Sequence, residues 1–228
     1  MTYKAVIFDL FGTLVDNFSV TEYHIILDEM SAILGAPEEA FRQAWKDSFN
    51  ERSTGAHGTE HDNYRVICRR IGVEPADEQI ERAYTIRHGY TLRSLRPRPD
   101  TLSTLKEVRA RGLKTALVSD CSGEVPSVWD RTPFASLFDV TVFSSVAGVK
   151  KPDPRIYQLA TDGLGVQPQD CLYVGDGSST ELTGARAVGM HPVLIIDPDE
   201  TVDTHYVQRE ENWDGPRISY LREVLDLL

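Results

Sequence analysis

Short apolar runs alternate with longer segments of helical periodicity along the chain. Four of these runs have the character of buried β-strands: residues 3–8 (YKAVIF), 115–118 (TALV), 171–174 (CLYV) and 192–196 (PVLII). Strands that alternate with helical patterns are typical of a parallel sheet covered by helices. The pattern therefore predicts an α/β fold.

The segment between Asp16 and Pro97 has a different character, because helical periodicity continues there without a convincing strand. The helical stretches are residues 20–34, 37–52, 62–71 and 77–92. The segment Arg96-Pro97-Arg98-Pro99 ends this region, since each proline disfavours helix in the residue before it. We expect a Rossmann-like doubly wound core of residues 1–16 and 96–228, with an inserted α-helical cap domain of residues 17–95. The acidic stretch 197–211 is expected to be a solvated loop.

Composition narrows the class of protein. The chain has 228 residues, 41% hydrophobic and 26% charged, as in ordinary globular proteins. Its net charge of −11 argues against nucleic acid or an anionic membrane as the main partner, so an anionic substrate needs a local positive site. The N-terminal apolar run is broken by Asp9, and we expect neither a secretory signal nor a transmembrane segment. Three widely spaced cysteines without metal-ligand spacing fit a reducing compartment, so a cytoplasmic protein is expected.

Polar clusters follow three of the predicted strands. Asp9 follows the first strand, Ser119-Asp120 the second and Gly175-Asp176 the third. Ligands of open α/β sheets bind outside the carboxyl ends of the strands. These clusters are therefore predicted to converge on one crevice.

The residues in these clusters suit attack on an electrophilic centre. Asp9 at a strand end, with Gly12 allowing close backbone approach, can act as a nucleophile. The hydroxyl of Ser119 can hydrogen-bond an anionic oxygen. Taken singly, an Asp that caps a turn and a Ser in a turn explain the same residues.

A lysine and a second carboxylate extend the pattern. Lys151, held before Pro152, would keep a neighbouring Asp9 ionised and offset the negative charge that develops during transfer. Asp9 and Asp176 at neighbouring strand ends would supply the hard oxygen ligands that Mg²⁺ prefers. A solvated lysine pair and an Asp-Gly turn are the alternatives when each is taken alone.

In combination and order, these motifs resemble the haloacid dehalogenase-like hydrolase superfamily over nearly the whole chain. The family's first motif matches at Asp9, Gly12 and Thr13, and its second-motif hydroxyl matches Ser119. The family's Lys-Pro and Gly-Asp motifs match Lys151-Pro152 and Gly175-Asp176. The helical segment between the first and second motifs resembles the family's small helical cap.

The resemblance implies a role for each matching residue. Asp9 would be the nucleophile and a metal ligand, with Asp176 and the backbone carbonyl of Phe11 as further ligands of Mg²⁺. Thr13 and Ser119 would contact the transferring group, and Lys151 would neutralise charge. Glu181 is an additional candidate ligand, although its loop is about one residue longer than the family pattern. Gly12 and Asp120 are expected to line the substrate site.

The chain departs from the family's phosphatases at Phe11, where they place an aspartate that transfers protons. A phenyl ring cannot transfer a proton. The family's 2-haloacid dehalogenases also carry an aromatic residue there and need no proton donor, but they tend to lose the metal-binding Gly-Asp. We therefore expect a Mg²⁺-dependent phosphomonoesterase acting on a small phosphorylated metabolite through a covalent aspartyl intermediate. The alternatives are a metal-independent dehalogenase and a catalytically degenerate phosphate-binding protein. Whichever function holds, we expect a monomer or a homodimer.

The expected cap carries candidate substrate-binding residues in the polar loop 51–61. Arg52 could clamp an anionic group, and His57 or His61 could supply the missing proton transfer. An exposed loop with solvated side chains is the alternative. Trp45 and Phe49 follow helical spacing and are expected in the core of the cap.

Overall fold

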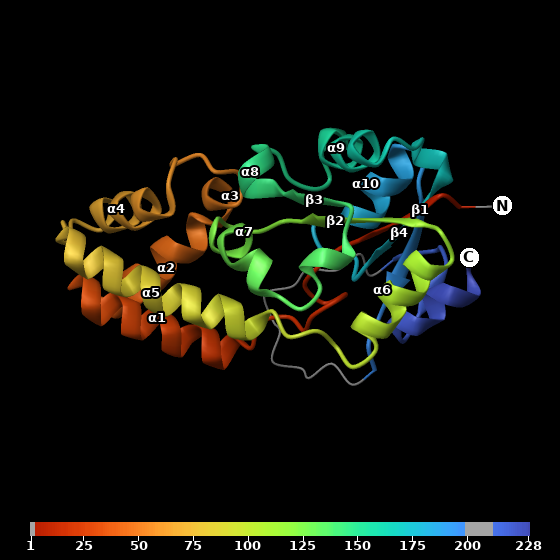
Figure 1. Cartoon of the computed structure of the whole chain (residues 1–228). Helices are drawn as coiled ribbons and strands as arrows, with labels where there is room; N and C mark the ends of the chain where they lie inside the picture. Colours follow the sequence, from red (N-terminus) through yellow and green to blue (C-terminus); the bar gives the residue numbers. More distant parts are fainter. Residues whose placement is uncertain (1–2, 199–211) are drawn as a thin grey trace.

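The computed structural model describes residues 3–198 and 212–228 (Figure 1). Within these ranges the strands form one parallel sheet in the order β3-β2-β1-β4-β5-β6. The strands are β1 Ala5–Phe8, β2 Lys114–Ser119, β3 Val140–Phe143, β4 Cys171–Gly175, β5 His191–Ile195 and β6 Arg217–Ile218. The strand order reverses between β1 and β4, the position at which such sheets bind ligands. The predicted doubly wound α/β fold is confirmed.

Both faces of the sheet are covered by helices, which explains why its strands are continuously apolar. In β1, Val6 and Phe8 belong to one hydrophobic cluster and Ala5 and Ile7 to the other, and all four are fully buried. The helices of the first face are α6 Thr101–Ala110 and the 3₁₀ segment η4 Leu221–Asp226. Those of the second face are α9 Pro154–Leu164 and α10 Glu181–Ala187 (Figure 1).

Two strands lack a strong sequence signal. Strand β3 lies at the sheet edge, where Thr141 is exposed and Val140 half-buried, so no long apolar run marks it. Strand β6 has only two residues. The remaining short elements near the sheet are α7 Glu124–Val128, α8 Ser144–Ala147, η1 Trp129–Arg131, η2 Ala135–Leu137 and η3 Pro168–Asp170.

Five helices before α6 pack together beside the sheet, and we call them the helical unit (Figure 1). They are α1 Val20–Leu34, α2 Glu38–Asp47, α3 Phe49–Arg52, α4 Glu60–Arg70 and α5 Asp77–Ser94. The unit has its own core, which includes the fully buried Met30, Phe41 and Tyr64. Helix α1 begins where the Ser19 side chain accepts a hydrogen bond from the Glu22 N–H, and ends at Gly35 in the left-handed region.

The structure changes some details of the expected helical region. Ser48 divides the predicted helix over 37–52 into α2 and α3. Trp45 lies in the core as expected, but Phe49 is 43% exposed, so its assignment to the core was wrong. Of the expected acidic loop 197–211, residues 199–211 lie outside the described residues. Among the helices that the structure describes, none is both long and apolar enough to cross a membrane.

The two chain segments that join the sheet to the helical unit are bonded to each other. Val15 pairs with Pro97 as an antiparallel bridge. The buried Arg98 donates from Nη1 to the Gly12 carbonyl at 2.7 Å and from Nε to Asp16 Oδ1 at 3.0 Å. The loop that follows β1 is therefore held by the segment that leaves α5.

Candidate active site

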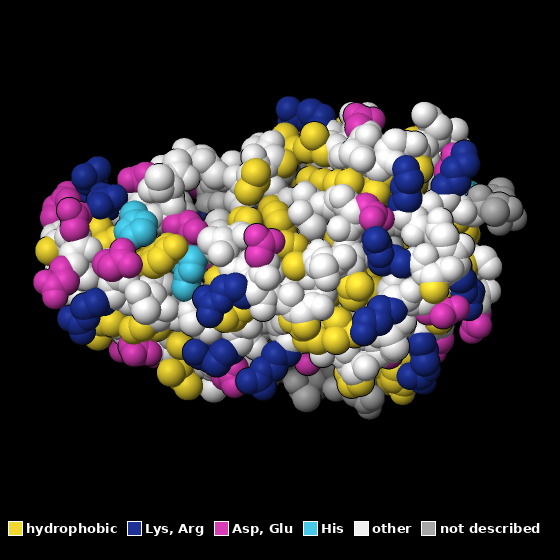
Figure 2. All heavy atoms as spheres, in the orientation of Figure 1, with side chains coloured by type: hydrophobic (Ala, Val, Ile, Leu, Met, Phe, Trp, Pro, Cys, Tyr) yellow, Lys and Arg dark blue, Asp and Glu magenta, His cyan; other side chains and the backbone are white. Residues whose placement is uncertain are grey.

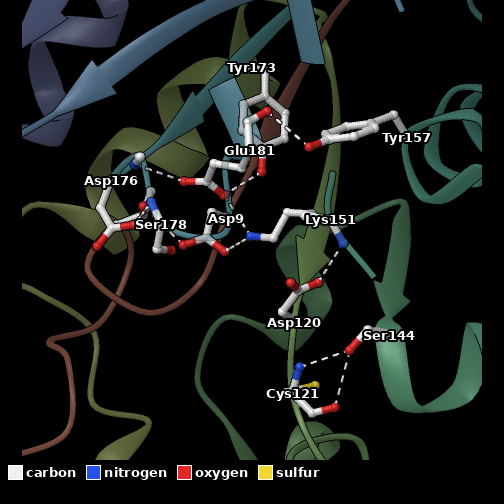
Figure 3. A network of polar contacts seen from close by, with 12 residues as sticks. Asp9, Asp120, Cys121, Ser144, Lys151, Tyr157, Tyr173, Asp176, Ser178 and Glu181 are labelled. Atoms are coloured by element: carbon white, nitrogen blue, oxygen red, sulfur yellow. Dashed lines mark hydrogen bonds and ion pairs between the residues drawn. The ribbon is translucent and has the colours of Figure 1, made fainter. Parts of the chain in front are cut away.

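The predicted strand-end residues converge at the carboxyl edge of β1, β2 and β4 (Figure 3). Lys151 lies among them, and its Nζ donates to Asp9 Oδ1 at 2.6 Å and to Glu181 Oε2 at 2.6 Å. The side chains of these three residues are at most 5% exposed. Burial lowers the pKa of Lys151, but the carboxylates of Asp9 and Glu181 outweigh that effect and raise it well above its ordinary value. Lys151 is therefore a fixed positive charge in contact with Asp9.

Glu181 anchors Lys151 through further contacts. Its Oε2 accepts the Tyr173 hydroxyl at 2.7 Å, and its Oε1 accepts the Gly177 N–H at 3.0 Å (Figure 3). The Tyr157 hydroxyl donates to the Glu181 backbone carbonyl at 2.9 Å. Because helix α10 begins at Glu181, the start of this helix fixes the ammonium of Lys151.

Asp9 is a carboxylate that is difficult to ionise. Burial, together with the neighbouring Asp176, raises its pKa to about 6 against the lowering effect of Lys151. Thr13, which is fully buried, donates to Asp9 Oδ2 at 3.3 Å. Each oxygen of Asp9 is thus contacted by a different donor, from Lys151 on one side and Thr13 on the other.

Three buried carboxylates, those of Asp9, Asp176 and Glu181, form a group that fits a metal cation. One oxygen from each lies within 4.8 Å of the others. The ammonium of Lys151 bonds to two of them, those of Asp9 and Glu181, while burial raises the pKa of Glu181 well above its ordinary value. Hard divalent cations take such oxygen ligands. A Cβ at Gly12, whose φ is +76°, would lie 2.3 Å from Asp176 Oδ2, so only glycine leaves this approach open.

The remaining strand-end residues lie at the same edge. Ser119 is fully buried at the end of β2 and does not line the cavity described below. Asp120 lines that cavity, and its Oδ1 accepts the Lys151 N–H at 3.0 Å. The other oxygen of Asp120 is buried and makes no hydrogen bond within the described part of the chain.

A cavity of about 750 Å³ opens between the strand ends and the helical unit. Asp9, Lys151 and Asp120 lie at its sheet side, and Arg52 and Arg87 at its helical side. Phe11 also lines the cavity, with its ring 4.6 Å from that of Phe18. On the face shown in Figure 2, acidic and basic side chains are interspersed, so no continuous basic patch marks this face.

Of the substrate-binding residues expected in the cap, Arg52 lines the cavity, whereas His57 and His61 do not. Arg52 is 2% exposed and already donates to Ser48 and Trp45, so it is built into the cavity wall and is not an exposed clamp. The two histidines do not line the cavity. His57 Nδ1 contacts Asn63 at 3.0 Å, and His61 Nε2 contacts Glu81 at 2.9 Å. The structure therefore does not bring either histidine to Asp9.

Sequence reasoning missed Arg87, although a signal was present. The buried positions Ile80, Ala83, Arg87 and Tyr90 of α5 follow helical spacing. An arginine within such an apolar stripe is unusual, because Arg is rarely fully buried unless it is paired. Arg87 is nevertheless 4% exposed and lines the cavity.

Residues 3–189 match the family of haloacid dehalogenase-like hydrolases. A glyceraldehyde 3-phosphate phosphatase of Methanopyrus kandleri is 30% identical over 84% of this chain and 83% of its own length. An (S)-2-haloacid dehalogenase of Pseudomonas putida is 28% identical over 85% of each chain. The structure of a phosphatase from Thermococcus onnurineus, 24% identical, covers 98% of this chain and 97% of its own, with a TM-score of 0.68.

Proposed function

Because the chain belongs to the haloacid dehalogenase-like hydrolases, we propose that it is a Mg²⁺-dependent phosphatase acting on a small phosphate monoester. The observation that carries this proposal is the buried contact between Asp9 and Lys151 beside a retained Asp176. A nucleophilic carboxylate needs a neighbouring cation, and a transferring phosphoryl group needs the further positive charge that a metal supplies. The phosphatase relative from Methanopyrus supports the same class of reaction.

The chain's residues account for the first transfer as follows. A carboxylate oxygen of Asp9 attacks phosphorus, an Asp9 O–P bond forms, and the bond from phosphorus to the leaving oxygen breaks. Lys151 stabilises the charge that develops, while Thr13 holds the second oxygen of Asp9. Asp9 and Asp176 would hold the cation, with Glu181 beside them, and the bound cation supplies charge neutralisation. Water then attacks phosphorus and releases Asp9 and phosphate.

The proton transfers need a group other than Phe11, and we assign them to Asp120. It lines the cavity with Asp9, and one of its oxygens is buried without a hydrogen bond to the described residues. As a carboxylic acid it can donate a proton to the leaving oxygen in the first transfer, and the carboxylate so formed can accept the proton of the attacking water in the second. Figure 3 shows Asp120 beside Lys151, to whose N–H its other oxygen is bonded.

The helical unit would select the substrate. We assign residues 17–95 to a cap domain and residues 1–16 and 96–228 to the catalytic core, as the sequence predicts. The cavity lies between these parts, and residues from both line it. A cap over a strand-end crevice excludes water from the reacting groups.

Dehalogenation is a second candidate, favoured by Phe11 and by the dehalogenase relative from Pseudomonas putida. Halide is a leaving group that needs no proton. The group of three buried carboxyl side chains weighs against it, since this arrangement suits a divalent cation, which a metal-independent reaction does not need.

One set of assays separates these functions. Phosphate release from small phosphomonoesters is measured with Mg²⁺ and with excess chelator, and halide release from 2-chloropropionate is measured with chelator. We expect phosphate release that depends on Mg²⁺ and disappears in Asp9→Asn. Metal-independent halide release would establish the dehalogenase, and neither activity would establish a binding protein.

A further inference from the structure

Arg87 is a buried cation with unfilled hydrogen-bonding capacity. It lies on α5, is 4% exposed and lines the cavity that also contains Asp9. Its Nε and Nη1 are buried and make no hydrogen bond within residues 3–198 and 212–228. Glu124 Oε1 lies 3.6 Å from Nε, which is beyond hydrogen-bond distance. A guanidinium has five N–H donors, so a buried one that lacks acceptors is under-satisfied.

Aromatic rings surround this guanidinium and hold its position. Its Cζ lies 5.0 Å from the Tyr23 ring, 5.5 Å from that of Tyr90 and 5.7 Å from that of Phe18. Ring faces attract a cation but offer no ordinary acceptor for its N–H groups. Because the Phe18 ring also packs at a tilt of 35° against that of Phe11, an apolar wall connects Arg87 with the loop of Asp9.

The charges around Arg87 do not balance. Arg52, Arg87 and Glu124 are all at least 95% buried. Burial raises the pKa of Glu124, but Arg87 and Arg52 outweigh that effect and hold it below its ordinary value. Glu124 is therefore ionised, and two guanidinium groups share one carboxylate. A buried positive charge without a partner is costly, and an anionic ligand group would remove the imbalance.

Building on the phosphatase function, we propose that Arg87 binds a second anionic group of the substrate on the helical side of the cavity. The substrate class is then a phosphate monoester whose largely apolar body carries a carboxylate or a second phosphate. Arg42 lines the same cavity but is already bonded to Asp28 at 2.5 Å and to Glu38 at 2.8 Å. Because carboxylates already accept its hydrogen bonds, Arg42 is the control: an arginine that lines the cavity but is not expected to bind the second anionic group.

The test compares three phosphate esters that share a five-carbon chain: pentyl phosphate, 5-phosphooxypentanoate and pentane-1,5-diol bisphosphate. We expect kcat/KM for at least one of the two esters with a second anionic group to exceed that for pentyl phosphate by about tenfold or more. Arg87→Met should bring this ratio to about one, whereas Arg42→Met should preserve it. Comparison of 5-phosphooxypentanoate with the bisphosphate shows whether the second anionic group is a carboxylate or a phosphate.

A second variant keeps the test independent of folding. Arg87→Met leaves Glu124 buried without its partner, so Arg87→Met/Glu124→Leu removes both charges together. The expected loss of preference is the same, and melting temperatures are recorded beside the kinetics. No preference in the wild type, or a preference that survives in both Arg87 variants, overturns the proposal.

Failure of the phosphatase function gives a different result. If the protein hydrolyses neither pentyl phosphate nor the two esters with a second anionic group, the proposed reaction fails. Ligand binding to Asp9→Asn then decides the role of Arg87. The ligands are pentylphosphonate and 5-phosphonopentanoate. Tighter binding of the carboxylated phosphonate that is lost in Asp9→Asn/Arg87→Met supports the subsite, and equal or absent binding overturns it.

Discussion

The ammonium of Lys151 lies 2.6 Å from Asp9 Oδ1, and neither side chain is more than 5% exposed. In the proposed reaction Asp9 is the nucleophile, and the ammonium of Lys151 favours its ionised form. A carboxamide at position 9 would have nearly the same shape but would be a poor nucleophile. We therefore expect Asp9→Asn to fold and to lose turnover. A variant that retains more than about a tenth of the wild-type rate, a loss of only ~1.4 kcal/mol, would exclude Asp9 as the nucleophile.

Metal binding should depend on pH through Asp9. Its pKa is raised from 3.8 to about 6, so the folded protein loses the ionised ligand as the pH falls through that value. We expect Mg²⁺ affinity, measured by calorimetry, to fall as the pH drops through about 6 and to approach a loss of about tenfold per pH unit well below it. An affinity that is unchanged between pH 7.5 and 5 would contradict this role.

Asp176 should affect metal binding and catalysis together. Its carboxylate belongs to the buried acidic group, so Asp176→Ala removes a ligand. We expect Mg²⁺ affinity and kcat/KM to fall in parallel, measured by titration and by phosphate release. The exposed Asp130 provides the control, since Asp130→Ala should change neither. Full activity of Asp176→Ala in chelator would favour the dehalogenase.

Phe11 can be tested by restoring the carboxylate that the family's phosphatases place there. If proton transfer limits the rate, Phe11→Asp should accelerate alkyl phosphates more than activated aryl phosphates, because an activated leaving group departs without protonation. The ring of Phe11 packs on that of Phe18, so a melting curve must accompany the kinetics. A folded variant with no gain, together with a large loss in Asp120→Asn, would place proton transfer at Asp120 alone.

Trp45 and Phe49 should separate stability from substrate binding. Trp45 is 1% exposed in the core of the helical unit, so Trp45→Ala should cost ~3–5 kcal/mol of unfolding free energy. Both residues line the cavity, but Phe49 is 43% exposed, so Phe49→Ala should cost about 1 kcal/mol or less and act mainly on KM. Denaturant unfolding and steady-state kinetics on the same samples measure both effects. Equal destabilisation by the two substitutions would contradict this division.

The strand ends explain why much of the site could be predicted. Asp9, Asp120 and Asp176 follow strands whose apolar character shows in sequence, and parallel strands bring their carboxyl ends to one edge. The contact of Glu181 with Lys151 depends instead on where α10 begins and how its first turn faces, which spacing alone does not determine.

The helical unit was less predictable for a similar reason. His57 and His61 look available in sequence, but in the structure they contact local partners in the unit, Asn63 and Glu81, and do not line the cavity. Which side of each helix faces the cavity depends on helix–helix packing, and so on contacts distant in sequence. Arg87 shows the same limit, because its helical spacing marks it as buried without showing that it faces a cavity.

Arg98 is hydrogen-bonded to Gly12 and Asp16, beside the bridge between Val15 and Pro97. These contacts should constrain movement of the helical unit relative to the sheet. With both connections joined at one point, a rotation of the helical unit relative to the sheet would turn about these contacts. Since Arg98 bonds to the carbonyl of the residue three positions after Asp9, the contacts lie within the loop that carries Asp9. A rotation that opens the cavity would therefore also move the loop of Asp9.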